Sequence, residues 1–495
     1  MGRSLALVVL LAACSPGPPS SPDATGSGGS GSGSAADPND GAVSGSRLKL
    51  TWYAFSDGTR QWSGLYDSER KEYCSPYEGA WPDGNSYCVP DSSGNNVVFS
   101  DAGCTQPEVD EYVGSTCAAA ASRYALDETY DNCSEQYLPS HLYLVGTPLS
   151  ATSYYEQLSD GSCAMFTVDP SFEQLYTASS EVMTSDLVQL TLSAPEGSGS
   201  LGVRSWESSD GAKLPAHLTD AVNGLDCTPE YYGDSASTAA CAPTDAFDAY
   251  LDRDAACEQP ALDVTSTCAA PPYAYTYPQT SCPSDLASYF AVGAKLASPS
   301  LYESFGTTCE AATADPTESY YQLGGALSLA QLQRTPDTDG SHRIQIIHYD
   351  NAAGLHFRDP TYLYDSQEQA VCVPEQLADG STRCVPDSGT DVTTGYYFTA
   401  SSCTATSAID VVDIYTGPAT CTAPTLPAYV RKYVTSTGCE ASFELHQLAS
   451  KISTSLYYLD GTTCTKYTPF EEVFYGIGPA ISTNDFESAA IATDN

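Results

Sequence analysis

The sequence predicts an all-β protein that contains three internal repeats of about 145–150 residues. Two observations carry this prediction. Short runs rich in Val, Tyr, Thr and Ile recur along the chain and are separated by turn signals such as "SDGT", "SSDG" and "LDGTT", which is the pattern of strands and turns. The cysteines also fall into three similarly spaced groups, which indicates that one unit is present three times.

The cysteine groups define the repeat. The chain has 19 cysteines, and all but Cys14 fall into three groups of six. The groups begin at Cys74, Cys227 and Cys372, and the text around them agrees: "GLYDSERKEYC" resembles "YLYDSQEQAVC", and "DGNSYCVPDSSG" at 83–94 resembles "DGSTRCVPDSGT" at 379–390. The middle copy is weaker, with "HLTDAVNGLDC" and "CAPTD". We therefore place the repeats at residues 47–198, 199–340 and 341–495.

Six cysteines per repeat in a secreted chain predict a disulfide framework. Six cysteines allow 15 connectivities, and we favour sequential pairing because the first pair brackets a short strand–turn–strand segment. The expected disulfides are Cys74–Cys88, Cys104–Cys117, Cys133–Cys163, Cys227–Cys241, Cys257–Cys268, Cys282–Cys309, Cys372–Cys384, Cys403–Cys421 and Cys439–Cys464. Zinc is the alternative, but CxxC pairs and Cys–His clusters are absent from the sequence, so no metal site is expected.

Three architectures suit such repeats. A four-stranded propeller blade takes about 40–50 residues, so each repeat could hold two blades and the chain a six-bladed β-propeller, which we favour. The alternatives are three disulfide-stapled β-domains in tandem and another closed β-structure; the short junctions between repeats favour one closed body. Helical signals are weak and confined to "CAAAASRYALDETY" at 117–130 and "ESAAIATDN" at 487–495.

The N-terminus predicts export. Arg3 precedes a short apolar run, which has the proportions of a signal peptide over residues 1–13 and is too short to span a bilayer. The run ends in "LAAC", which resembles the lipobox of bacterial lipoproteins. That resemblance implies cleavage before Cys14, lipid attachment to Cys14 and anchoring to a membrane; Ser15 in place of Asp favours the outer membrane. Residues 14–46 are rich in Gly, Ser and Pro and are expected to form a flexible linker.

The charge limits the partners. The formal net charge is −43, with 62 acidic residues against 19 Lys and Arg, which argues against nucleic acid. Calcium-binding loops are the sharper interpretation of the acidity, and "PDTDG" at 336–340 and "DPNDG" at 37–41 come nearest. Neither has the spaced oxygen ligands and closing Glu of an EF-hand.

No motif in the sequence identifies a catalytic site. The elbow G-x-S-x-G, the P-loop and HExxH are absent, and "GSGSLG" at 197–202 has no βαβ context. His342, His348 and His356 cluster without ligand spacing. Acids such as Asp248, Asp252 and Asp254 are numerous, and a glycosidase pair depends on a separation that sequence does not give. We expect no cofactor.

Paired tyrosines are the remaining candidate for binding. They occur at 154–155, 231–232, 320–321, 396–397 and 457–458, where alternation in a strand would turn one ring inward and one outward. Exposed rings suit sugars or peptides. The body from residue 47 onward is also similar to uncharacterised Tyr- and Cys-rich repeat lipoproteins of Gram-negative bacteria. We expect a membrane-anchored extracytoplasmic binding or structural module for a glycan or an envelope protein; the alternative is a secreted polysaccharide hydrolase or lyase.

Overall fold

The computed structural model describes residues 41–494 apart from short internal gaps, and it confirms the all-β class. The only helices in this part of the chain are three single 3-10 turns. The gaps are 78, 92–94, 113–122, 132, 135, 159–160, 172, 198, 232–237, 278–286, 298, 306–307, 338–341, 388–390, 417–425, 436–440, 462 and 470–471.

One sheet runs through all three repeats and closes on itself as a barrel. Each repeat gives it four consecutive strands and a fifth strand that follows about 90–100 residues later along the chain. The first repeat contributes β1 (Leu48–Phe55), β2 (Arg60–Asp67), β3 (Glu72–Pro76), β4 (Ser86–Pro90) and β12 (Val188–Leu192). The second contributes β13 (Leu201–Ser208), β14 (Lys213–Asp220), β15 (Leu225–Tyr231), β16 (Thr238–Pro243) and β25 (Gln331–Pro336). The third contributes β26 (Ile344–Asp350), β27 (His356–Asp365), β28 (Ala370–Gln376), β29 (Thr382–Pro386) and β37 (Ser488–Thr493).

The sheet closes where β37 pairs antiparallel with both β29 and β1, at Thr382↔Ala489 and Phe55↔Ala489. The terminal "ESAAIATDN", weakly helical by composition, is therefore mostly strand. Ala and Ile at these positions fit because β37 lies between two strands that fix its backbone, and this pairing outweighs local helix propensity.

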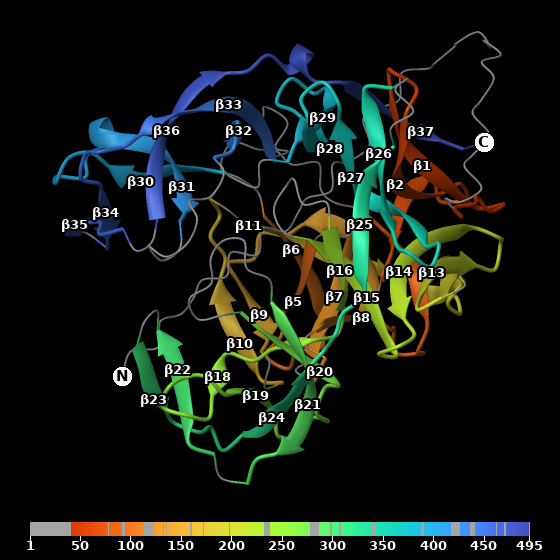
Figure 1. The fold of residues 1–495 in the computed structure, drawn as a ribbon, viewed down its shortest axis with the longest axis horizontal. Helices are drawn as coiled ribbons and strands as arrows, with labels where there is room; N and C mark the ends of the chain where they lie inside the picture. Colours follow the sequence, from red (N-terminus) through yellow and green to blue (C-terminus); the bar gives the residue numbers. More distant parts are fainter. Residues whose placement is uncertain are drawn as a thin grey trace.

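Between its fourth and fifth closed-sheet strands, each repeat inserts an outer sheet (Figure 1). The first outer sheet has the strands β5 (Asn95–Phe99), β6 (Pro107–Tyr112), β7 (Tyr124–Asp131), β8 (Gln136–Pro148), β9 (Ser153–Gln157), β10 (Cys163–Thr167) and β11 (Glu173–Glu181). The second has β17 (Phe247–Asp248), β18 (Leu251–Asp252), β19 (Pro260–Thr265), β20 (Tyr273–Thr276), β21 (Ser288–Lys295), β22 (Leu301–Phe305), β23 (Thr308–Ala312) and β24 (Glu318–Ala326). The third has β30 (Val392–Phe398), β31 (Ala408–Tyr415), β32 (Tyr429–Thr435), β33 (Ala441–Lys451), β34 (Tyr457–Asp460), β35 (Thr463–Lys466) and β36 (Glu472–Ala480).

The three outer sheets share one strand order. The first runs β10-β9-β5-β6-β11-β8-β7 and the third β35-β34-β30-β31-β36-β33-β32. The second matches them once β17 and β18 are taken together as the counterpart of β5. In Figure 1 the third outer sheet is blue at the upper left and the second is green at the bottom.

This pairing differs from a six-bladed propeller. A propeller of two blades per repeat needs six separate radial sheets, whereas the described strands form one closed sheet and three outer sheets. The alternative of disulfide-stapled β-domains in tandem fits the outer sheets, and the closed sheet joins them into one body.

Equivalent positions confirm that the repeats share local structure. The first two strands of each repeat pair with a register shift next to Thr51, next to Arg204 and between Ile346 and His348, which is one slot in the repeat. A bulge at this slot increases the local twist that a closed sheet requires.

A buried aspartate ends the second strand of each repeat and caps the following turn. These residues are Asp67, Asp220 and Asp365, all at most 3 % exposed. Arg47 donates two hydrogen bonds to Asp67, and Arg343 donates three to Asp365. The second repeat has Ser200 at the arginine position, and there the Asn223 amide donates to Asp220 at 2.7 Å.

The core of the closed sheet lies at the junctions between repeats. One cluster joins Leu48 and Trp52 to Trp206 of the second repeat, and another joins Leu218 to Tyr349 of the third. Arg358 of the third repeat lies 5.9 Å from the ring centre of Trp52 and 5.3 Å from that of Trp62. Burying a large apolar side chain stabilises a fold by about 1.5–3 kcal/mol. These two clusters therefore hold neighbouring repeats to one another.

Only some of the disulfides join cysteines that are consecutive in the sequence. The first and second cysteines of each repeat are joined, as expected: Cys74–Cys88, Cys227–Cys241 and Cys372–Cys384. The third cysteine is joined to the sixth: Cys104–Cys163, Cys257–Cys309 and Cys403–Cys464. Cys133 of the first repeat is joined to Cys268 of the second.

Six expected disulfides are therefore wrong, because one or both of their cysteines have another partner. They are Cys104–Cys117, Cys133–Cys163, Cys257–Cys268, Cys282–Cys309, Cys403–Cys421 and Cys439–Cys464. The physical reason is the docking of the β9–β10 hairpin on β5 through Phe99↔Tyr155, which brings Cys163 to the turn that holds Cys104. Sequence spacing does not reveal this docking.

The predicted linker is shorter than expected at its C-terminal end. Val43 pairs with Lys213, and the Ser44 hydroxyl donates to the Asp494 carboxylate at 2.9 Å, so residues 41–46 belong to the folded body. Cys14 and residues 1–40 lie outside the described residues. Within the described part of the chain, no helix is long and apolar enough to cross a membrane. Seven disulfides in that part indicate an oxidising, extracytoplasmic location.

Candidate functional site

Each outer sheet carries an Asp–Glu pair in the same place. Asp110, Asp263 and Asp413 lie opposite Leu175, Tyr320 and Phe474 on the neighbouring strand, and a Glu precedes each of those partners by two residues. The pairs are Asp110 with Glu173, Asp263 with Glu318, and Asp413 with Glu472. A diagonal position of this kind brings long side chains within reach of one another.

Burial raises the pKa of one carboxyl in each of these pairs: Asp110, Glu318 and Asp413. Burial and the neighbouring Glu173, Glu156 and Glu111 raise the pKa of Asp110 to about 7. Burial also raises the pKa of Asp413, and a hydrogen bond with Glu472 and the repulsion between the two carboxyls add to the effect. The third pair therefore shares a proton near neutral pH.

Tyrosine hydroxyls donate hydrogen bonds to the carboxyls of the second and third pairs. Tyr467 donates to Glu472 in the third repeat. In the second, Tyr320 donates to Glu318 at 2.9 Å and Tyr250 to Asp263 at 2.8 Å. Because the third pair shares a hydrogen bond, it does not leave the gap of about 5–9 Å that sugar hydrolysis needs between two carboxyls. A feature present in all three copies is most simply part of the framework.

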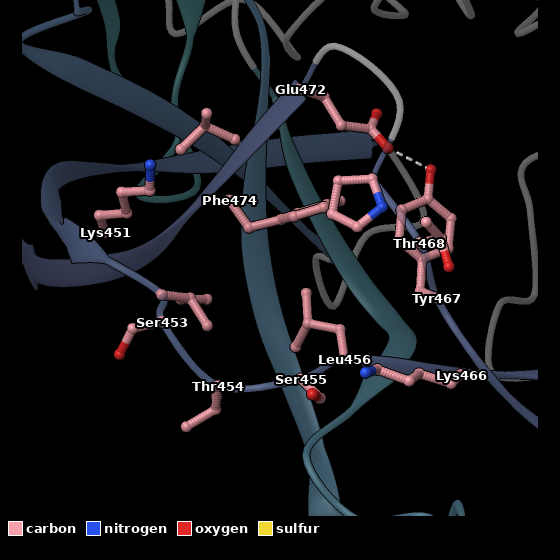
Figure 2. Close-up of a pocket in the computed structure, with 13 residues that line it drawn as sticks. Lys451, Ser453, Thr454, Ser455, Leu456, Lys466, Tyr467, Thr468, Glu472 and Phe474 are labelled. Atoms are coloured by element: carbon pink, nitrogen blue, oxygen red, sulfur yellow. Dashed lines mark hydrogen bonds between the residues drawn. The ribbon is translucent and has the colours of Figure 1, made fainter.

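A pocket lies beside the pair in the third repeat (Figure 2). Its volume is about 390 Å³, within the range of about 300–1,000 Å³ for small-molecule sites. It lies between the loop from β33 to β34, the end of β35 and the start of β36. Its lining includes Lys451, Ser453, Thr454, Ser455, Leu456, Lys466, Tyr467, Thr468, Glu472 and Phe474.

Two lysines flank this pocket. Figure 2 shows Lys451 on one side and Lys466 on the other, with Lys466 reaching toward Ser455. Both are exposed, and neither ammonium has a carboxylate within 4.0 Å among the described residues. Most other Lys and Arg side chains in the described residues form ion pairs with carboxylates, as Arg343 does with Asp365 and Arg431 with Asp391. In a chain this acidic, two unpaired lysines at one pocket set it apart.

The lysine pair is specific to the third copy. Lys466 lies opposite Tyr457, and the matching positions are Met165 opposite Tyr155 and Ala311 opposite Tyr302. Lys451 lies opposite Tyr475, and the matching positions are Pro148 in the first repeat and Lys295 in the second. Lys295 is tied to Ser319 by a hydrogen bond of 2.6 Å. The first two copies therefore lack this arrangement.

The rings of Tyr467 and Phe474 line the pocket, and Tyr397 packs against both. The ring centres of Tyr467 and Phe474 are 5.6 Å apart, and Tyr397 lies 5.2 Å from Tyr467. Tyr396 stacks on Tyr458 at 6.0 Å. Two of the tyrosine doublets identified from the sequence, 396–397 and 457–458, thus meet in one outer sheet.

The doublets follow the expected alternation in part. Tyr397 is buried and Tyr396 is 49 % exposed. Tyr154 and Tyr320 are also buried, each with a less buried neighbour in its strand. Of the doublet 231–232, the second residue lies outside the described residues.

The histidines and the other acids noted in the sequence do not form a site. His348 is buried and stacks on His356 at 3.8 Å, while His342 contacts the backbone carbonyl of Asp57. No group of three or more His, Cys, Asp or Glu side chains in the described residues is arranged to hold a metal ion.

The loops at 37–41 and 336–340 are only partly described: Gly41 from the first, and Pro336 and Asp337 from the second. Asp254 accepts hydrogen bonds from two backbone amides of its own turn, and Asp252 is buried.

A second, smaller pocket of about 270 Å³ lies at the edge of the first repeat. Arg47 and Asp210 contribute to its lining. Arg47 is bonded to Asp67, and Asp210 accepts from the backbone amide of Leu48 at 2.8 Å. Its charged groups therefore serve the fold.

The sequence did not single out Lys451 or Lys466. A signal was present, since aligning the three final cysteines places Lys466 against Met165 and Ala311. Shared features of the copies pointed to the framework, whereas the site lies where one copy departs from the other two.

Comparison with known proteins places the chain in a family. No curated protein and no solved structure matches it. A family model matches residues 28–486, which includes nearly all of the three repeats. The chain therefore belongs to the family of unknown function DUF7481.

Proposed function

We propose that this protein is a lipid-anchored extracytoplasmic binding module that recognises a glycan through the pocket of the third repeat. The observation that carries the proposal is the pocket of the third repeat, which combines an aromatic wall with a run of hydroxyl side chains. Sugar sites use this combination, because rings cover the apolar face of a sugar and hydroxyls bond its edges.

The anchor is part of the proposal. Cys14 carries the lipid, residues 14–40 form the tether, and the outer membrane is the proposed location. Metabolic labelling with a fatty-acid analogue should mark the wild-type chain and not the Cys14→Ser variant. Equal labelling of both would refute attachment at Cys14, and no labelling of either would refute the anchor.

The binding test uses the oxidised, secreted chain from residue 15 onward and a microarray of envelope polysaccharides. Thr454→Trp should block the pocket, because Thr454 is exposed on its rim. Thr152→Trp is the matched control, since Thr152 occupies the equivalent exposed loop of the first repeat. We expect saturable binding that Thr454→Trp abolishes and Thr152→Trp leaves intact. Binding that both variants retain, or no binding to any glycan, contradicts the proposal.

A second candidate function is cleavage of a polysaccharide by a hydrolase or lyase. It is favoured by the raised pKa of Asp413 and by the position of its partner Glu472 in the pocket lining. It is disfavoured by the shared hydrogen bond and by the repetition of the pair in every copy. The test is release of oligosaccharides from the polysaccharides that bind; release that Asp413→Asn abolishes would favour catalysis.

A further inference from the structure

We infer that the ligand of the third-repeat pocket is an acidic oligosaccharide, whose carboxylates contact Lys451 and Lys466 on opposite sides of the pocket. The inference rests on the proposed glycan-binding function and adds the charge of the ligand. It is carried by the two lysines, by the hydroxyl side chains between them and by the absence of the lysine pair from the other copies.

The charge argument starts from the whole chain. With a formal charge of −43, the protein repels anions at long range. At an ionic strength of 0.15 M this repulsion is screened beyond about 8 Å, so local charges decide what binds. Lys451 and Lys466 provide two local positive charges with no carboxylate partner in the described residues. The carboxylates of a bound oligosaccharide would supply the missing counter-ions.

The hydroxyl side chains narrow the ligand to a sugar. Ser453, Thr454 and Ser455 follow one another between the two lysines, and Thr468 lies across from them. None of the four side chains has a hydrogen-bond partner among the described residues. Such groups donate to and accept from sugar hydroxyls, whereas an acidic peptide offers mostly backbone groups and carboxylates.

The apolar wall completes the recognition. Tyr467 is held by its hydrogen bond to Glu472, and Phe474 packs against it. Because Tyr467 is fixed before binding, its ring contacts a sugar at little cost in conformational entropy. The carboxyl pair therefore supports the site without itself touching the anion.

The test uses the oxidised chain from residue 15 onward and paired probes in titration calorimetry. The probes are hexamers of galacturonate, guluronate and glucuronate, each beside its carboxyl-reduced neutral counterpart. We expect at least one acidic hexamer to bind and its neutral counterpart to bind at least 10-fold more weakly. Lys451→Gln and Lys466→Gln should each weaken that binding about 10- to 100-fold, as expected for loss of a charge-assisted contact.

Lys295→Gln is the control, since it removes the same charge at the equivalent position of the second repeat and should leave the affinity unchanged. The inference is overturned if neutral hexamers bind as well as acidic ones, if the lysine variants bind normally, or if no acidic hexamer binds. The proposed glycan binding is judged separately by the microarray and Thr454→Trp, so its failure and the failure of this inference are distinguishable.

Discussion

Cys133 in the turn between β7 and β8 forms a disulfide with Cys268, which lies 135 residues further along and belongs to the next repeat. This bond joins the fifth cysteine of one copy to the fourth cysteine of the next. It links two outer sheets that do not share a strand ladder. The outer sheets are therefore held together covalently as well as through the closed sheet.

Because the three copies are equivalent, the same link between a fifth and a fourth cysteine is expected between the other copies. The fifth cysteine of the second copy is Cys282 and the fourth of the third is Cys421; the corresponding step from the third copy to the first joins Cys439 and Cys117. These four cysteines lie outside the described residues, and we predict their pairing from the repeat alone. Non-reducing peptide mapping by mass spectrometry should find Cys133–Cys268, Cys282–Cys421 and Cys117–Cys439. Peptides that link neighbouring cysteines of one copy, such as Cys104 and Cys117, would contradict the prediction.

Removing the arginine from a buried cap should destabilise the protein strongly. Arg343→Ala leaves the fully buried Asp365 without the three hydrogen bonds that Arg343 donates, at 2.8–3.1 Å. Loss of one partner of a buried ion pair costs about 3–5 kcal/mol. Urea unfolding of the oxidised chain should show a matching fall in the unfolding free energy. Lys432→Ala is the control, because its pair with Asp410 is about one-third exposed and such pairs contribute about 0–1 kcal/mol. Equal effects of the two variants would count against the cap.

Glycine at one position of the turn after the second strand of a repeat should raise the stability of the protein. Lys71 and Gln369 have φ values of 60° and 53°, and the equivalent residue of the second repeat is Gly224 with φ of 70°. A side chain in this left-handed region costs about 1 kcal/mol relative to glycine. We expect Lys71→Gly and Gln369→Gly to raise the melting temperature by a few degrees and Gly224→Ala to lower it. Opposite signs, measured by thermal unfolding, would show that the side chains stabilise the turn by other contacts.

Stability should fall as the pH rises from about 4 to about 7. The ordinary pKa of Asp110 is 3.8 and its folded pKa is about 7, so the folded protein keeps a proton that the unfolded chain has lost. Proton uptake on folding makes the unfolding free energy decrease with pH in this window and level off above it. The Asp110→Asn variant should show a shallower decrease in unfolding midpoint between pH 4.5 and 7.

Asp101→Asn provides the control for this pH dependence. Hydrogen bonds from Thr105 and neighbouring amides lower the pKa of Asp101, so its stabilising effect is present above its ordinary pKa and is lost below about pH 4. This variant should be less stable without a changed slope between pH 4.5 and 7. If Asp110→Asn keeps the full slope, the carboxyl pairs do not retain protons in the fold.

The repeat and the all-β class could be predicted from the sequence because both depend on short local sequence patterns. Turn residues punctuate the strands, and "LYDS" before Cys74 and Cys372 marks the buried caps at Asp67 and Asp365. The closed sheet could not be predicted, since it depends on pairings such as Val188↔Cys88 across the inserted outer sheet. Composition does not specify which distant strand is the neighbour.

The candidate site was missed for a related reason. Asp413 and Glu472 are 59 residues apart and meet only because β31 pairs with β36. Tyrosine doublets gave a partial signal, because alternation along a strand is local and it correctly buries Tyr397 while exposing Tyr396. The lysines carried no motif, and only their departure from the other two copies distinguishes them.

The pairing of β1 with β37 has a consequence for export. One edge of β1 has no partner until a strand made more than 400 residues later has emerged from the translocation channel. Until then the chain presents an unpaired strand edge, which is prone to join other chains. Contacts of such long range also slow folding. We therefore expect the partly exported protein to depend on extracytoplasmic chaperones or on early disulfide formation to avoid aggregation. A chain cut before Ser488 would keep that open edge permanently.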